Sequence, residues 1–218
     1  MNSNSFIKKL EEIKEQNESS IQDYFNNLAK YLFSQLVICA GGDKYTFIEI
    51  EFYYHDDKIF NAPIYNCTYP RTCEVGKFFW HNSGVDICFD SKESSESEGF
   101  FGGILIRSLM KNGKEIVTGP MRCANELKNS CNDEITISYK SEEIIKLYCT
   151  TRYGIDDDKS QPENNFKRFC YFIMPQTWNR TKENVWIMDT INKTYKKGKK
   201  NDYYGARPDK RMIPKLVM

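Results

Sequence analysis

The sequence has few metal-binding side chains and no long apolar run. It contains 2 histidines, His55 and His81, and none of its 8 cysteines stands in a C-x-x-C pair. A zinc site usually needs four such ligands with short spacings between them, so we expect no metal. No stretch reaches the roughly 18 consecutive apolar residues of a membrane-spanning helix, so we expect no membrane partner.

The first residues also lack the features of a targeting segment. Residues 1–5 carry no basic side chain and no apolar stretch follows them, so the sequence predicts no secretory signal peptide. Cys39, Cys88 and Cys170 stand in apolar runs, where a free thiol behaves as a small core side chain. We therefore expect a soluble protein in the reducing environment of the cytoplasm.

The chain has little net charge but many aromatic residues. Lys and Arg number 31 against 30 Asp and Glu, which gives a formal charge of +1. No global field therefore indicates a nucleic-acid or membrane partner. The aromatic fraction of 14 % is high. A Tyr/Phe-rich sheet core is the commoner cause, and a pocket that stacks flat ligands is the alternative.

The spacing of apolar residues predicts helices followed by strands. From residue 5 to residue 36 they recur every three or four positions, with a break near residues 17–20. Beyond residue 36 short apolar segments alternate with Gly-, Asn- and Pro-containing turns. The strands expected cover residues 36–40, 45–54, 77–80, 85–89, 102–109, 115–117, 134–139, 144–151 and 166–174, with a helix from Pro120 to about Leu127.

These segments predict an α+β fold, in which a curved, mainly antiparallel sheet of about eight strands has a few helices packed around it. Residues 1–20 are expected to form a helical appendage, residues 21–192 the main domain and residues 193–218 a basic tail. The tail carries nine Lys or Arg against two Asp, with tyrosines between them. It suits a nucleic-acid-binding arm and equally a solvated chain end. The lysines expected to contact nucleic acid are Lys196, Lys197, Lys199 and Lys200.

The strand at residues 45–54 is the strongest candidate for chemistry. Strict alternation places Glu49, Glu51 and Tyr53 on one face. The simpler interpretation is a half-buried strand with a wet acidic face. The functional interpretation is a carboxylate held rigidly beside an aromatic ring, which can activate a water while a flat base stacks nearby. The side chains on the opposite face are then Ile48, Ile50 and Phe52.

Six short blocks follow one another between residues 28 and about 174. The first combines L-A-K-Y-L at 28–32 with E-I-E-F-Y at 49–53. The others are G-V-D-I-C-F at 84–89, G-I-L-I-R-S-L at 103–109, G-P at 119–120 followed by Leu127, T-R-Y-G-I at 151–155 and K-R-F at 167–169.

In their order and spacing, these blocks resemble the methylpurine (alkyladenine, or 3-methyladenine) DNA glycosylases, and the segment at 76–84 is similar to a divergent branch of that family. The resemblance implies that Glu51 is the general base, that Tyr53 stacks against the extruded base, and that Arg107 holds the water and a phosphate. Trp80, with His81 beside it, falls near a second base-binding position, and Tyr153 near a backbone carbonyl that binds the water.

The chemistry that the resemblance implies is base excision in DNA repair. An alkylated or otherwise modified base is flipped out and its N-glycosidic bond is hydrolysed, with no metal or cofactor. The substrate is then DNA, single-stranded nucleic acid or a free nucleotide carrying such a base.

Three departures from the family motivate an alternative. Ser83 stands where the family inserts a tyrosine into the DNA, and Asp90 stands where it has an asparagine. Its pocket histidine has no secure counterpart, because Ala62 and Asn66 fall nearest and His55 is displaced. The alternative is a catalytically silent module that binds a nucleotide, nucleic acid or protein partner. Arg107 would then form a structural ion pair, and His81 would be a satisfied surface or core histidine.

Overall fold

One sheet and three α-helices make up the described part of the computed structural model, which comprises residues 4–56, 73–91, 99–130, 134–143, 145–150, 152, 168–173 and 215–217. The helices are α1 (Asn4–Glu11), continued by a 3-10 turn (Glu12–Glu15), α2 (Ile21–Gln35) and α3 (Pro120–Ser130). The ten strands in these residues are β1 (Leu36–Ala40), β2 (Asp43–Asp56), β3 (Phe78–His81), β4 (Gly84–Cys88), β5 (Phe100–Lys111), β6 (Glu115–Thr118), β7 (Thr136–Tyr139), β8 (Tyr148–Thr150), β9 (Cys170–Phe172) and β10 (Lys215–Leu216).

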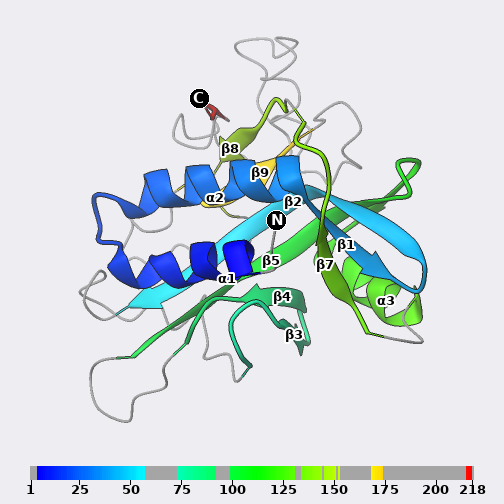
Figure 1. Cartoon of the computed structure of the whole chain (residues 1–218), viewed down its shortest axis with the longest axis horizontal. Coiled ribbons are helices and arrows are strands. Elements are labelled where there is room, and N and C mark those ends of the chain that lie inside the picture. Colours follow the sequence, from blue (N-terminus) through cyan, green and yellow to red (C-terminus); the bar gives the residue numbers. More distant parts are fainter. Residues whose placement is uncertain are drawn as a thin grey trace, which may run out of the picture.

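The sheet is organised around β2 and β5, which pair along their whole length (Figure 1). One edge of β2 carries β1 near its start, with β7 beyond β1, and β9 near its middle, with β8 and β10 beyond β9. The outer edge of β5 carries β4 and β3 near its start and β6 near its end. Every one of these pairings is antiparallel, which confirms the expected α+β class with a mainly antiparallel sheet.

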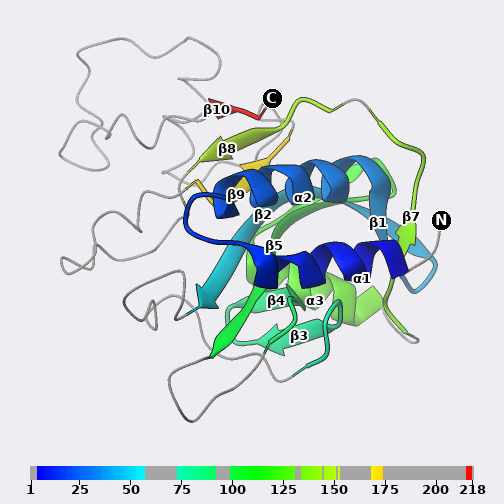
Figure 2. The same cartoon turned by 60° about the vertical axis from the view of Figure 1, so that its left-hand side comes forward.

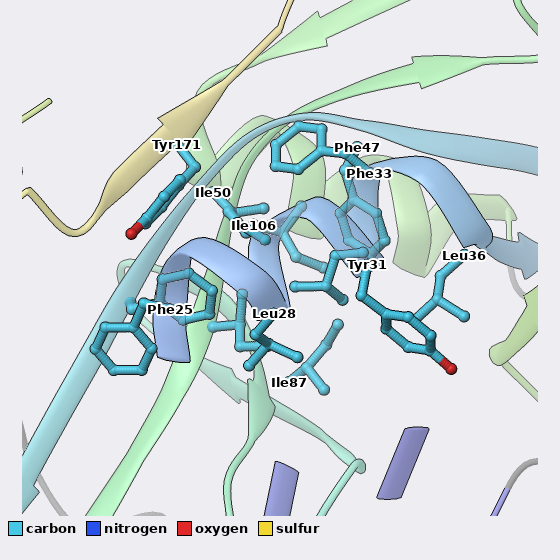
Figure 3. Packing of buried hydrophobic residues seen from close by; sticks show 14 of the residues in the cluster. Phe25, Leu28, Tyr31, Phe33, Leu36, Phe47, Ile50, Ile87, Ile106 and Tyr171 are labelled. Atoms are coloured by element: carbon cyan, nitrogen blue, oxygen red, sulfur yellow. The ribbon is translucent and has the colours of Figure 1, made fainter. Parts of the chain in front are cut away.

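Helices α1 and α2 lie side by side against one face of the sheet (Figures 1 and 2). The three-and-four spacing of α2 buries Phe25, Leu28 and Leu32 completely or nearly so. The ring of Phe25 stacks on Phe52 of β2 with centroids 4.3 Å apart. Figure 3 shows this helix face against Ile50 of β2 and its neighbours. Each such side chain contributes about 1.5–3 kcal/mol through burial, so this face fixes which side of β2 points inward.

The N-terminal segment is part of the same core. Phe6, Leu10 and Ile13 are buried in one cluster with the residues of α2. The charge of this segment lies on its outer side, and the apolar side chains face inward. The described part of residues 1–20 is thus helical, as expected, but it is packed into the core and does not stand apart from it as an appendage. Among the described residues, no helix is long and apolar enough to cross a membrane.

Side chains along β2 stop alternating between the two faces of the sheet beside Ile48, where the strand has a bulge. Phe47 and Ile50 both belong to the core cluster, although a regular strand would point them to opposite faces. The partner strand has the same interruption between Ile106 and Leu109, and the pairing register shifts there. Ile48 is buried outside the core cluster, so its expected place beside Ile50 is wrong. A bulge of this kind redirects the side chains that follow it.

Cys88 is not the free core thiol that the sequence suggested. It forms a disulfide with Cys73, which closes a loop of sequence separation 15. The same loop is tied by backbone hydrogen bonds from Gly76 N–H to the Cys88 carbonyl and from Cys88 N–H to the Lys77 carbonyl. Cys39, Cys123, Cys149 and Cys170 are free. The disulfide fastens the chain before β3 to the end of β4.

Candidate active site

A row of side chains crosses the face of the sheet that points away from α2. Glu51 on β2 stands directly opposite Cys170 on β9 and Leu105 on β5, and Leu105 stands opposite Asp86 on β4. Residues directly opposite each other in a sheet project from the same face. Two carboxylates from distant parts of the sequence therefore share this face.

Glu51 is fully buried and both of its carboxylate oxygens are engaged. Oε1 lies 3.1 Å from Nη1 of Arg107, and Oε2 accepts a 2.7 Å hydrogen bond from the Tyr53 hydroxyl. Tyr53 reaches it because residues two apart on a strand share a face. The structure thus brings together Glu51, Tyr53 and Arg107, the three residues that the resemblance groups in one site.

Glu49 completes the cluster and was not among the predicted site residues. Its Oε1 accepts a 3.0 Å hydrogen bond from Nε of Arg107, and its Oε2 accepts one of 3.0 Å from the Ser108 hydroxyl. Arg107 and Ser108 are neighbours in sequence, and both reach Glu49 because the bulge interrupts the alternation of β5. One guanidinium therefore bridges two buried carboxylates, which is the arrangement that buried charges require. The E-x-E pattern was the sequence signal for this pair.

Burial sets the protonation of the groups around the two carboxylates. It raises the pKa of Glu49, and the nearby Arg107 cation only partly opposes this. Burial and then Glu51 raise the pKa of the Tyr53 hydroxyl well above its usual range, so this hydroxyl stays protonated as a donor. Burial disfavours the Arg107 cation, but the carboxylates of Glu51 and Glu49 outweigh this and raise its pKa.

Two cysteines near the cluster are protonated thiols. Sγ of Cys170 lies 3.8 Å from Oε1 of Glu49, and burial, reinforced by Glu49, raises its pKa well above the usual range. Burial raises the pKa of Cys123 to about 12. Because the thiolate is the nucleophilic form of cysteine, neither side chain is suited to nucleophilic attack.

Arg152 is a second cation at the site that sequence reasoning missed. Its guanidinium carbon lies 4.9 Å from the Tyr53 ring centroid and 5.5 Å from that of Phe169, both within the range of cation–π contacts. Its Nη1 donates to the Phe52 carbonyl at 3.4 Å. The T-R-Y-G-I block contains this arginine, but the resemblance pointed to its neighbour Tyr153, which lies outside the described residues.

Trp80 and His81 point to opposite faces of the β3–β4 hairpin. Trp80 is paired with Val85, packs against the core, and has the Lys128 ammonium 4.9 Å from its ring centroid. It therefore does not share the face of Tyr53, contrary to its expected role as a second stacking ring. His81 lies on the face of Asp86, with its Nε2 3.3 Å from Oδ1 of that carboxylate.

His55 lies closer to the site than its place in the sequence suggested. It is 1 % exposed, and alternation along β2 puts it on the face of Glu51 and Tyr53. Its ring stacks against Phe101 with centroids 4.7 Å apart. In the sequence this histidine is displaced from the family pattern, whereas the sheet places it at the end of the row Glu49, Glu51, Tyr53.

The structure also places Ser83 and Asp90, the two other positions at which the sequence departs from the family. Ser83 is exposed in the turn between β3 and β4, where its N–H donates to Nδ1 of His81 at 3.2 Å. Asp90 forms an ion pair with Lys14, in the 3-10 turn after α1. Ala62 and Asn66 lie outside the described residues, as do Lys196, Lys197, Lys199 and Lys200. Within the predicted tail, Lys215 and Leu216 form β10 and pair with β8.

An open depression of about 240 Å³ lies away from this cluster. Phe6 and Ile7 of α1, Leu36 of β1, Phe78 of β3 and Ile137 of β7 contribute to its lining. Its lining does not include the residues around Glu51. In the part of the chain that the structure describes, no group of three or more His, Cys, Asp or Glu side chains could hold a metal ion.

Comparison with known proteins gives a similarity to one viral protein. No protein-family model and no solved structure matches the chain. The chain is 32 % identical over 127 residues to an uncharacterized protein of Acanthamoeba polyphaga mimivirus. The alignment covers 49 % of this chain and 57 % of the viral protein, so the chain spans little more than half of that relative. Because the relative is itself uncharacterized, function is inferred from the site.

Proposed function

We propose that this protein is an N-glycosylase that hydrolyses the glycosidic bond of a modified base in DNA or a nucleotide. One observation supports the proposal above the others. The fully buried Glu51 carboxylate is held on a rigid strand by Tyr53 and Arg107. These are the three residues to which the glycosylase-like blocks assign the base, the stacking ring and the positioning cation.

In this proposal Glu51 accepts a proton from a water molecule as the water oxygen forms a bond to the sugar carbon C1′. The bond between C1′ and the base nitrogen breaks, its electron pair leaves with the base, and the base takes a proton from solvent. Positive charge develops on the sugar as the base departs, and the carboxylate stabilises it. Arg107 fixes one oxygen of Glu51, and the Tyr53 hydroxyl fixes the other.

A silent binding module is the second candidate, and the same geometry favours it. Both oxygens of Glu51 are already engaged within the protein, as a purely structural carboxylate would be. Ser83 offers no ring to fill the gap left by an extruded base. The same face would then hold a nucleotide, nucleic acid or protein partner without cleaving a bond.

Base release from DNA carrying single modified bases distinguishes the two candidates. Alkylated and deaminated bases are tested in single- and double-stranded oligonucleotides, and abasic sites are scored by alkali cleavage. Glu51→Gln should lower the release rate by at least about 100-fold, the range of general-base contributions. Circular dichroism should show an unchanged fold.

Glu126→Gln is the matched control. Glu126 also accepts hydrogen bonds from a tyrosine hydroxyl and a cation, Tyr45 and Lys111, but it lies on α3 outside the cluster. This variant should keep the wild-type rate. Full activity in Glu51→Gln would remove Glu51 from the reaction. A folded wild-type protein that releases no base would leave the binding module, whose ligand affinity should survive Glu51→Gln.

A further inference from the structure

Strand β7 has a neighbouring strand on one edge only, within the residues that the structure describes. That neighbour is β1, and the pairs run from Leu36 opposite Tyr139 to Cys39 opposite Thr136. A strand at the edge of a sheet presents a row of backbone N–H and C=O groups, which is a template for pairing with another chain. The outer edge of β7 is therefore a candidate contact surface.

The hydrogen bonds between β1 and β7 show which backbone groups of β7 point outward. Lys140 N–H donates to the carbonyl of Gln35, the residue before β1, at 2.8 Å. Backbone groups of successive residues in an antiparallel strand point to opposite edges. Ser138 and Thr136 therefore also point toward β1, and Ile137 points outward. None of the described residues forms a hydrogen bond with Ile137 on that outer side.

The sequence of this edge is complementary to itself about Ile137. Residues 134–140 read Glu-Ile-Thr-Ile-Ser-Tyr-Lys. In a second copy that pairs antiparallel and is centred on Ile137, every residue meets a compatible partner: the facing pairs are Glu134 with Lys140, Ile135 with Tyr139, and Thr136 with Ser138. Opposite charges, aromatic with β-branched side chains, and hydroxyl pairs are the cross-strand pairs that stabilise antiparallel strands. By symmetry each of these pairs occurs twice.

The direction of the backbone groups selects the same register. Ile137 would stand opposite Ile137 of the second copy, and because both point outward they would exchange two hydrogen bonds. In a register shifted by one residue, Ile137 would stand opposite a residue whose backbone groups point toward β1. In a register shifted by two residues, Glu134 would stand opposite Ser138, or Lys140 opposite Thr136, and the charge pairs would be lost.

The apolar depression of about 240 Å³ lies beside the same strand. Phe6 of α1 and Phe78 of β3 line it together with Ile135 and Ile137, which are half-buried in the single chain. Residues that face each other on paired strands project from the same face of a sheet. Ile137 of the second copy would therefore lie at the rim of this depression and cover apolar side chains that the single chain leaves partly exposed.

We propose that two copies of this protein associate through β7, with the two strands antiparallel about a two-fold axis at Ile137. The two sheets then become continuous, and the closed symmetry uses both β7 edges completely. A pair of short strands buries little surface, so monomer and dimer should both be present at micromolar concentrations. The proposal does not depend on the proposed function, because the edge of β7 lies apart from Glu51.

Charge exchange across the two-fold axis tests this register. Glu134→Lys would place like charges opposite each other at both ends of the interface, and Lys140→Glu would do the same with the opposite sign. Each variant should raise the dimer dissociation constant, measured by sedimentation velocity, at least about tenfold, because two attractive pairs become repulsive. Lys140 also pairs with Glu143 of its own chain at 3.0 Å, so circular dichroism must show an unchanged fold.

A mixture of these two variants should restore the dimer. The chain with Glu134→Lys and the chain with Lys140→Glu are complementary at both ends of the interface, although each repels itself. The double variant with both substitutions should dimerise like the wild type. This pattern of loss and recovery distinguishes a specific register from a general effect of net charge.

Glu142→Lys and Lys146→Glu are the matched controls, because Glu142 and Lys146 are exposed, change charge in the same way, and lie beyond β7. Both should dimerise like the wild type. A wild-type protein that stays monomeric up to millimolar concentration would overturn the proposal, and this is also the result expected if the edge pairs with a strand of a different protein. A dimer that Glu134→Lys leaves intact, or a variant mixture that stays monomeric, would overturn it too.

Hydrogen exchange locates the contact by a measurement that needs no variant. The Ile137 N–H should exchange more slowly as protein concentration rises, whereas the Ser138 and Lys140 N–H groups, which point toward β1, should exchange at constant rates. A concentration-dependent dimer in which the Ile137 rate does not change would use another surface, and the assignment to β7 would be wrong.

Discussion

At the scale of single residues, the site depends on how buried charges are compensated. Arg107 bridges Glu49 and Glu51, and Ser108 adds a neutral hydrogen bond to Glu49. Removing one member of such a buried cluster usually destabilises a protein by about 3–5 kcal/mol, because it leaves an uncompensated charge. Substitutions of a carboxylate by a neutral side chain of similar shape, such as Glu→Gln, therefore test the role of the charge with the least disturbance of packing.

Glu49 should make the protein less stable as pH rises. Burial raises its pKa in the folded state above the roughly 4.3 of an unfolded chain. The folded state therefore holds the proton more tightly, and this contribution to the free energy of unfolding is fully present below the unfolded pKa. It is lost as pH rises through the folded pKa. Urea unfolding from about pH 4 to about pH 8 should show that the stability of wild type relative to Glu49→Gln declines with pH.

Glu126 supplies a control of opposite sign. The hydrogen bond from Lys111 lowers the pKa of this carboxyl, so its contribution is present above the unfolded pKa and is lost as pH falls. The stability of wild type relative to Glu126→Gln should therefore increase over the same pH range. A difference between wild type and Glu49→Gln that stays constant or grows with pH would contradict the assignment for Glu49.

At the scale of secondary-structure elements, two features of the backbone position the residues of the site. The bulge in the β2–β5 pairing interrupts the alternation of side chains on both strands, and this brings Arg107 and Ser108 to Glu49. The contact of α3 with β4 and β5 depends on Gly84, which begins β4 directly after Ser83. Its φ is +148°, and a Cβ atom placed there would lie 2.9 Å from Cβ of Pro120 and 3.1 Å from Cδ1 of Leu105. A glycine therefore lets the first turn of α3 approach the strand that carries Asp86.

Gly84→Ala should destabilise the fold by about 2–4 kcal/mol, since a strained backbone costs about 1–2 kcal/mol and overpacking adds more. Gly113→Ala is the control, because Gly113 also has a positive φ, +68°, but nothing lies within 4 Å of its added Cβ. It should lose only the backbone part, about 1–2 kcal/mol. Urea denaturation of both variants checks this, and equal losses would show that α3 yields to the extra methyl group.

At the scale of the whole molecule, the sheet forks on both sides of the central β2–β5 pair. The row through Glu51 crosses four strands, β9, β2, β5 and β4, and depends on chain segments from residue 51 to residue 170. The last described strand, β10, returns the end of the chain to this sheet. Deleting residues 193–218 would therefore remove a strand together with the basic cluster, so point substitutions are the better test of the predicted arm.

If the basic cluster contacts nucleic acid, replacing Lys196, Lys197, Lys199 and Lys200 with Gln should weaken binding and its salt dependence together. Each phosphate contact to a single strand contributes about 0.7 to the slope of log K against log salt. Losing four contacts should reduce that slope by about 3. Fluorescence anisotropy of a labelled single strand at several salt concentrations measures this.

Four lysines outside the tail serve as the control for that experiment. Lys8, Lys44, Lys114 and Lys146 are exposed, and replacing them with Gln removes the same total charge. If both quadruple variants reduce the slope equally, the effect is one of overall charge, and the tail is not an arm.

Several features of this protein follow from its sequence alone. The three-and-four spacing predicted α2, the period of two predicted β2, and Gly119-Pro120 predicted the start of α3, because side-chain periodicity and backbone restriction act within a few residues. For the same reason the placement of Glu51 and Tyr53 on one strand face was correct. Arg107, which the resemblance grouped with them, contacts Glu51, and its role there stays a prediction.

Tertiary structure decided which side chains meet across the sheet. The bulge that adds Glu49 and Ser108 to the cluster, the stacking of Arg152 on Tyr53, and the turning of Trp80 toward the core all depend on strand register. Periodicity constrains residues two or four positions apart, but it does not say which residue of a distant strand stands opposite. That choice is made by the packing of the whole core, which the apolar face of α2 and the buried residues of α1 determine together.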